Sequence, residues 1–140
     1  MTTRRIPRAA PWIAPAVVAA AAGGAAGLLV AVDPTEPGHY PTCPFLAVTG
    51  LYCPGCGTLR VVHQLLTGHP GAALGLNPLF VVALPFLLYA YLRWAGERVA
   101  GVRLPAVNAP PWSVRLVPVL IIAFGVARNI PIDPFTALAP

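Results

Sequence analysis

The amino-acid sequence predicts an all-α membrane protein with three transmembrane helices, a cysteine-containing loop and a short amphipathic interfacial helix. Of the 140 residues, 57% are hydrophobic and 9% are charged, a composition that differs from that of soluble domains. The apolar residues gather in three long segments, and all three cysteines lie in the longest connection between two of them. We therefore expect the lipid bilayer to be the main partner of the chain.

The charged residues and the overall composition indicate which partners the chain binds and what kind of organism encodes it. The net charge is +5, and the chain contains arginine but no lysine. The arginines are dispersed and no aromatic-rich basic face accompanies them, which argues against nucleic acid as a partner. Heavy use of alanine, glycine, proline and arginine is typical of a GC-rich bacterial genome. We therefore expect a multi-pass protein of the bacterial cell (inner) membrane.

The first predicted span covers residues 12–32, an uncharged run of about the 20 residues that a bilayer crossing needs. A cleaved signal peptide is the alternative, because arginines precede the run. However, the run is longer than a signal-peptide core of about 7–15 residues, and no small-x-small cleavage site precedes Asp33. We expect this segment to remain as a transmembrane helix.

The second predicted span covers residues 77–94. Asn77 is a good N-cap, and Pro78 suits the first helical position because its missing N–H has no intrahelical partner to lose. Two tyrosines and Trp94 lie near the other end, as expected of an aromatic belt at a membrane interface.

The third predicted span covers residues 112–130. Its strictly apolar part, from Leu116 to Ala127, is too short to cross a hydrocarbon core of about 30 Å at about 1.5 Å per residue. To span the bilayer, the helix must take Arg115 or Arg128 into the interface.

The positive-inside rule gives the expected orientation. Most arginines lie before the first span or between and beside the second and third: Arg4, Arg5, Arg8, Arg93, Arg98, Arg103 and Arg115. We therefore expect the N-terminal tail, residues 1–11, and the loop 95–111 to be cytoplasmic. The connection 33–76, whose one arginine is Arg60, and the tail 131–140 are expected on the external face.

Polar residues at the ends of the spans should converge on the face that carries the cysteines, whichever way the chain is oriented. These residues are Asp33, Asn77, Arg128 and Asn129. Two roles are open to Arg128: an interfacial anchor, or an inward-turned cation that pairs with Asp33 or Asp133 or binds an anionic group near the cysteines. We expect Asn77 to act first as the N-cap of the second span and only second as a site residue. The convergence of these polar residues on the cysteine-bearing face predicts a functional site.

The connection 33–76 is rich in proline and glycine, and we expect it to be irregular except for a helix at about 58–68. On that helix Leu59, Val62 and Leu66 share one face, with Gly68 placed to end it. The opposite face is polar and carries Arg60, His63, Gln64 and Thr67. Such a helix is suited to lie along the membrane surface.

The cysteines Cys43, Cys53 and Cys56 can bind a metal. The sequence CPGCG has the usual shape of a zinc knuckle, because proline and glycine let backbone N–H groups turn toward two thiolates, and Cys43 supplies a third. On a straight helix His63 lies about 10 Å along the axis from Cys56, which is far for a shared tetrahedral zinc ion. Three histidines are nevertheless candidates for the fourth ligand of zinc: His39, His69 and His63.

Two other chemistries are open to the same cysteines. A CxxC pair before a helix gains thiolate stability from the helix N-terminus, with help from Arg60, but the strands of a thioredoxin-like fold are missing. Alternatively, in an oxidising compartment Cys43 pairs with Cys53 or Cys56. This disulfide closes a loop of about 11 to 14 residues, worth about 3 kcal/mol in the chain-entropy model. One thiol then remains free or pairs with a partner protein.

With these residues in place, the chain resembles the bacterial domain-of-unknown-function family 2752, small membrane proteins with a CPxCGxTR-type motif. The resemblance runs from about Cys43 to Asn129 and implies a membrane location and a cysteine motif, with no known activity. Thr58 and Leu59 stand in the reverse of the commoner order, which moves the threonine by about 100° around a helix. The matching positions are Cys43, Pro44, Cys53, Pro54, Cys56, Gly57, Arg60, Gly68, Ala72, Asn77, Pro78, Arg128 and Asn129.

Together these patterns favour a binding or accessory protein over an enzyme. We expect a cap, held by a disulfide or a metal, that covers the external ends of the spans and packs against another membrane protein or a second copy. The alternative is a membrane thiol-redox or metal-dependent enzyme. In that case Cys53 and Cys56 react, and Arg60 and Arg128 bind an anionic substrate.

Overall fold

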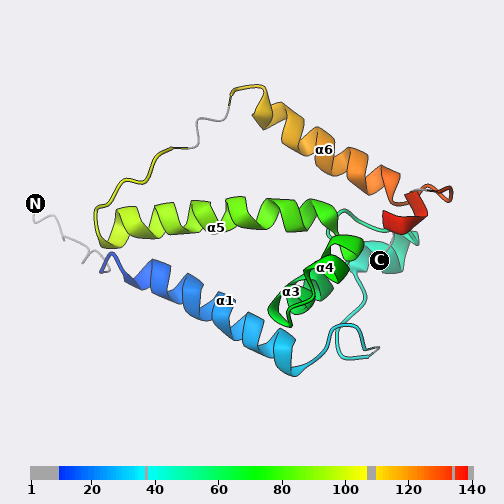
Figure 1. Cartoon of the computed structure of the whole chain (residues 1–140), viewed down its shortest axis with the longest axis horizontal. Helices are drawn as coiled ribbons and strands as arrows, with labels where there is room; N and C mark the ends of the chain where they lie inside the picture. The colour runs from blue at the N-terminus through cyan, green and yellow to red at the C-terminus, as the bar shows by residue number, and fades with distance from the viewer. Residues whose placement is uncertain (1–9, 37, 107–109, 134, 139–140) are drawn as a thin grey trace, which may run out of the picture.

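The computed structural model describes residues 10–36, 38–106, 110–133 and 135–138. Within these residues the chain is helical and forms no strand. Figure 1 shows three longer helices whose ends meet a cluster of short ones. The helices are α1 (Ile13–Ala31), α2 (Pro44–Thr49), α3 (Thr58–Leu66), α4 (Pro70–Leu76), α5 (Pro78–Val99), α6 (Ser113–Ala127) and the 3₁₀ helix η1 (Phe135–Leu138).

Two helices are long and apolar enough to cross a bilayer: α1, with 19 residues, and α5, with 22. The third apolar helix, α6, has 15 residues and is about 22 Å long. The prediction of three full-length transmembrane helices is therefore corrected to two, with a shorter apolar helix as the third. Helix α6 ends at Ala127, and the next two side chains, Arg128 and Asn129, bond the loop that carries the cysteines.

The cysteine-bearing segments lie at one end of the three longer helices. In Figure 1 the C-terminal ends of α1 and α6 and the N-terminal end of α5 all lie toward α3 and α4. At the far end, the Tyr91 hydroxyl donates to the Pro15 carbonyl at 2.9 Å and links α5 to α1. The four polar span ends predicted to converge therefore emerge on one side of the molecule.

Two short helices lie in the connection that the sequence predicted to be irregular. Helix α2 follows Cys43 and ends at Gly50, whose φ of +70° favours glycine, while α4 begins at Pro70. Both begin with a proline, whose missing N–H costs nothing in a first turn. The prediction missed them because helices of six and seven residues carry too little periodicity to recognise. Helix α5 also continues five residues beyond the predicted end at Trp94.

The amphipathic pattern of α3 indicated a helix along the membrane surface. In the structure, α3 is packed into the cap, by which we mean the connection 33–76. It contacts α1 and α4, and Val61 and His63 are buried between them. Leu59 and Leu66, predicted to face the membrane, are each about half exposed. The sequence placed His63 on the polar face of this helix; in the structure His63 is buried, and its ring bonds the C-terminal end of α1 at the Leu29 carbonyl.

Few side chains form a closed core. Among the described residues, the buried hydrophobic ones are Leu29, Cys56, Val61 and Ala73, and all lie at or near the cap. The apolar faces of the three longer helices are otherwise exposed. Much of the predicted N-terminal tail, 1–11, and parts of the predicted segments 95–111 and 131–140 fall outside the described residues.

Candidate metal centre

Three thiols from two separate segments meet at the cap. Cys43 directly precedes α2, while Cys53 and Cys56 lie in the turn before α3. The Sγ atoms of Cys43 and Cys53 are 3.5 Å apart, and those of Cys53 and Cys56 are 3.2 Å apart. All three sulfurs lie within 4.8 Å of one another, and all three residues are free thiols. Among the described residues, no other histidine, cysteine or carboxylate joins this group.

Residues 53–57 form the turn that carries two of the thiols, and we call it the cysteine turn. Hydrogen bonds within the turn stabilise it. The Cys56 N–H donates to the Cys53 carbonyl at 3.1 Å, and the Thr58 hydroxyl donates to the Gly55 carbonyl at 2.6 Å. Gly57 follows with a φ of +83°, in the left-handed region that side chains with a Cβ rarely adopt. A glycine directly after Cys56 is therefore required for the chain to enter α3 while the thiols of Cys53 and Cys56 face Cys43.

Asn77 holds this turn from the start of α5. It is fully buried, and its Oδ1 accepts the Phe80 N–H at 3.0 Å, which confirms the predicted N-cap. Its Nδ2 donates to the carbonyls of Pro54 at 2.9 Å and Cys56 at 3.2 Å. One side chain therefore caps a long helix and fixes the position of the cysteine turn.

Arg128 binds the same turn from the end of α6. Its side chain is 2% exposed, and Nη1 donates to the carbonyls of Cys53 at 3.2 Å and Cys56 at 3.0 Å. Nη2 donates to Leu76 at 3.3 Å and Nε to Leu138 at 3.1 Å. Of the two roles that the sequence left open, the structure shows an inward-turned cation. Within the described residues no carboxylate lies within 4.0 Å of it, so its partners are carbonyl oxygens.

Asn129 completes the attachment of α6 to the cap. Its Oδ1 accepts the Tyr52 N–H and its Nδ2 donates to the Tyr52 carbonyl, both at 2.8 Å. This two-bond pairing imitates a strand partner for the residue before Cys53. Close by, a Cβ on Gly125 would meet Pro54 at 3.3 Å, so glycine lets α6 approach the turn.

The two outer thiols have different acidities. The Leu46 N–H, followed by the Cys53 thiol, lowers the pKa of Cys43 to about 7. Burial, followed by the hydrogen bond with Cys53, raises the pKa of Cys56 to about 12. In the metal-free protein near neutral pH, a thiolate therefore forms at Cys43 before it forms at Cys56.

The three candidate histidines have other partners. His63 Nδ1 lies 2.7 Å from the Leu29 carbonyl and its Nε2 3.6 Å from Asp33 Oδ2. His39 lies 3.4 Å from Glu36 Oε2, and His69 is exposed. The structure brings none of them into the sulfur group. Asp33 likewise lies beside His63 and apart from the thiols.

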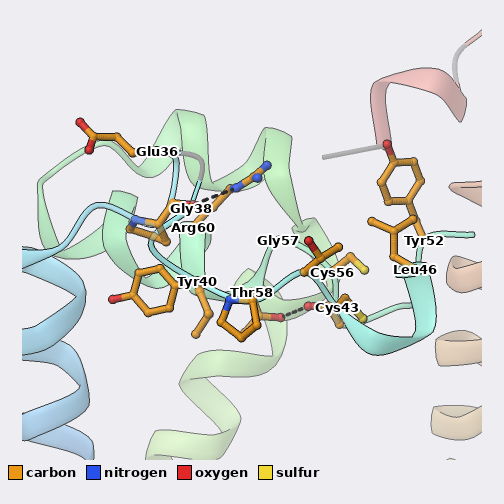
Figure 2. Close-up of a pocket in the computed structure, with 15 residues that line it drawn as sticks. Glu36, Gly38, Tyr40, Cys43, Leu46, Tyr52, Cys56, Gly57, Thr58 and Arg60 are labelled. Atoms are coloured by element: carbon orange, nitrogen blue, oxygen red, sulfur yellow. Dashed lines mark hydrogen bonds between the residues drawn. The ribbon is translucent and has the colours of Figure 1, made fainter. Parts of the chain in front are cut away.

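A cavity of about 510 Å³ borders the thiols, and we call it the thiol pocket. Its lining includes Cys43, Cys56, Tyr40, Thr58 and Arg60 (Figure 2). Arg60 enters from α3 and donates from Nε to the Pro34 carbonyl at 3.3 Å. The pocket therefore combines thiols with a cation at the surface of the cap.

Sequence reasoning identified the polar side chains but not what they bind. Most of the partners of Asn77, Arg128 and Asn129 are backbone carbonyls at or near the cysteine turn, and a backbone carbonyl has no signature in a sequence. Tyr52 was missed for the same reason, since it contributes its N–H and carbonyl to Asn129. In the sequence, Gly125 is a single glycine in an apolar helix. Such glycines are common without any close contact, so the sequence did not indicate the contact with Pro54.

Residues 43–91 match the family described as "Protein of unknown function (DUF2752)", which confirms the resemblance drawn from the cysteine motif. The match runs from Cys43 into α5 and includes all three cysteines and Asn77. It ends before α6, so Arg128 and Asn129 lie outside it, although the sequence resemblance was drawn as far as Asn129. No curated protein and no solved structure matches the chain.

Proposed function

We propose that the chain is an integral membrane protein that binds a transition-metal ion, most favourably zinc, through Cys43, Cys53 and Cys56 in a cap on the external face. The convergence of three sulfur atoms from two segments within 4.8 Å carries this proposal. In a tetrahedral zinc site with bonds of about 2.3 Å, neighbouring sulfurs lie about 3.8 Å apart. The thiol spacings of 3.5 and 3.2 Å need only small side-chain rotations to reach that geometry.

Arg128 supplies the charge that such a centre needs. Three thiolates around one divalent cation leave a single negative charge, and placing it in a partly buried cap is costly without a counter-charge. The buried guanidinium bonds the carbonyls of Cys53 and Cys56 directly behind the thiols. Three thiolates, a divalent ion and this one arginine therefore have a net charge of zero.

Membrane placement is supported by where the apolar surface lies. Side chains such as Val17, Phe86 and Ile122 are 61 to 65% exposed on the three longer helices, far from the cap. A soluble protein rarely leaves so many large apolar side chains in water. We propose α6 as the third crossing. A helix of about 22 Å requires local thinning of the bilayer, with Trp112 and Arg115 at the cytoplasmic interface. The arginine distribution puts the N-terminus in the cytoplasm of a bacterial cell.

A thiol-redox role is the second candidate. The 3.2 Å contact between the Sγ atoms of Cys53 and Cys56 and the lowered pKa of Cys43 favour it. In this role Cys53 and Cys56 form a disulfide, and their two electrons and two protons reduce a disulfide of a partner protein to two thiols. A bound metal prevents that reaction because it engages the same sulfurs.

Metal content and thiol accessibility separate the two candidates. The full chain is extracted in detergent, its zinc is counted by elemental mass spectrometry, and its thiols are titrated with a maleimide before and after a chelator. Metal binding predicts about one zinc per chain and thiols that react only after the chelator. A disulfide predicts that two of the three thiols react only after a reductant.

The matched variants are Cys56→Ser, which should lose zinc, and His39→Ala and His69→Ala, which should keep it. Because a cysteine variant can fail to fold, the chelator experiment on the unaltered chain decides independently. Labelling intact cells with a membrane-impermeant maleimide after the chelator tests the external placement. Labelling that requires lysis contradicts it.

A further inference from the structure

A second hollow in the molecule is almost wholly apolar. It lies between α5 and α6, has a volume of about 680 Å³, and we call it the α5–α6 groove. Six of its lining side chains are Val82, Phe86, Leu87, Val117, Leu120 and Ile121. Each of these is at least 39% exposed, so helix–helix packing does not close the groove. In Figure 1 the two helices diverge from the cap toward their far ends.

The groove and the thiol pocket are adjacent at the cysteine turn. Gly55 and Thr58 line both hollows, and Pro54 closes the cap end of the groove. A molecule at this junction can therefore place a polar part beside the thiols and an apolar part between α5 and α6. The two volumes, about 510 and 680 Å³, are each within the range of ligand sites.

Arg60 is the cation in the lining of the thiol pocket, which also includes the Glu36 carboxylate. The side chain is half-buried, and among the described residues only the Pro34 carbonyl accepts a hydrogen bond from it, at Nε. The two terminal nitrogens have no acceptor among the described residues. Figure 2 shows the Glu36 carboxylate directed away from Arg60, and that carboxylate lies 3.4 Å from His39. A guanidinium with its fork free is suited to bind a phosphate or carboxylate.

We propose that one anionic phospholipid binds here, with its phosphate against Arg60 in the thiol pocket and an acyl chain in the α5–α6 groove. This inference rests on the proposed membrane placement of α5 and α6 and is independent of the metal. The bilayer supplies the ligand directly along the open groove. The alternative occupant is a helix of a partner protein, and a chain that binds no phosphatidylglycerol in detergent would favour it.

Native mass spectrometry of the full chain in detergent tests the proposal. The chain is titrated with phosphatidylglycerol, with phosphatidylcholine, and with glycerol phosphate, which has the head-group charge but no acyl chain. We expect one tightly bound phosphatidylglycerol per chain, weaker binding of phosphatidylcholine, and no saturable binding of glycerol phosphate. Equal affinity for the first two lipids, or saturable binding of glycerol phosphate at lipid-like concentrations, overturns the proposal.

Two pairs of variants locate the ligand. Arg60→Gln should weaken phosphatidylglycerol binding by about tenfold, the effect of losing charge-assisted hydrogen bonds. Arg103→Gln, at an 87% exposed arginine beyond α5, should have no effect. Ala83→Phe fills the groove and should abolish binding, whereas Ala90→Phe, on an exposed position of the same helix outside the groove, should not.

Equal effects within either pair overturn the assignment to this site. Failure of the inference is distinguishable from failure of the proposed function. If the chain leaves membranes in alkaline carbonate without detergent, the membrane placement is wrong and the lipid proposal fails with it. If a chelator removes no zinc but lipid binding follows the expected pattern, only the metal proposal fails.

Discussion

Replacing Arg128 with methionine should destabilise the cap by about 3 kcal/mol. The change keeps an apolar stem of similar length but removes donors to five carbonyl oxygens. Three of these oxygens keep another donor, since the Cys56 N–H bonds the Cys53 carbonyl and Asn77 Nδ2 bonds the carbonyls of Pro54 and Cys56. The carbonyls of Leu76 and Leu138 keep none among the described side chains, and each orphaned acceptor costs about 1–3 kcal/mol. Removing a buried charge recovers part of that cost.

The assay is thermal unfolding of the purified chain in detergent, followed by circular dichroism. A loss of about 3 kcal/mol corresponds to roughly 10 °C for a chain of this size. Maleimide labelling of Cys56, which is 8% exposed, should also become faster in the metal-free variant. Arg115→Met, at an exposed arginine in the first turn of the same helix, is the matched control and should change neither quantity. If both variants unfold at the same temperature, the buried guanidinium does not hold the cap together.

Three further predictions follow from the same contacts. In metal-free protein, the alkylation rate of Cys43 should rise with pH and level off above its pKa of about 7. Cys56 should stay unreactive to about pH 10. Mass spectrometry of labelled peptides measures both rates. His63→Ala should lower the unfolding free energy by about 1–3 kcal/mol, because the buried Leu29 carbonyl loses its donor, yet zinc content should not change. Gly125→Val should destabilise the chain by about 1–3 kcal/mol through contact with Pro54, whereas Gly23→Val, with nothing within 4 Å, should not.

The sequence predicted those features that depend on composition and local chemistry. The apolar runs placed α1 and α5, and Asn77 followed by Pro78 gave the start of α5. The alternation of crossings predicted that Asn77, Arg128 and Asn129 emerge on the face that bears the cysteines. In the structure these side chains bond the cysteine turn.

Features that depend on tertiary contacts could not be predicted. His63 is buried because α3 packs against α1. An amphipathic pattern cannot show whether the membrane or another helix covers a face of α3. The predicted end of the third span, at residue 130, lies three residues beyond the end of α6. The Asn129 and Ile130 N–H groups bond carbonyls three residues earlier, as in the closing turn of a helix, and Pro131 disfavours the helical conformation for the residue before it.

X-ray absorption at the zinc edge of the purified, metal-loaded chain tests the central claim most directly. The account predicts three sulfur atoms at about 2.3 Å from the ion and one lighter ligand, and loss of the sulfur shell in Cys43→Ser. A shell of oxygen and nitrogen alone, or a chain that holds no zinc and contains a disulfide, would contradict it.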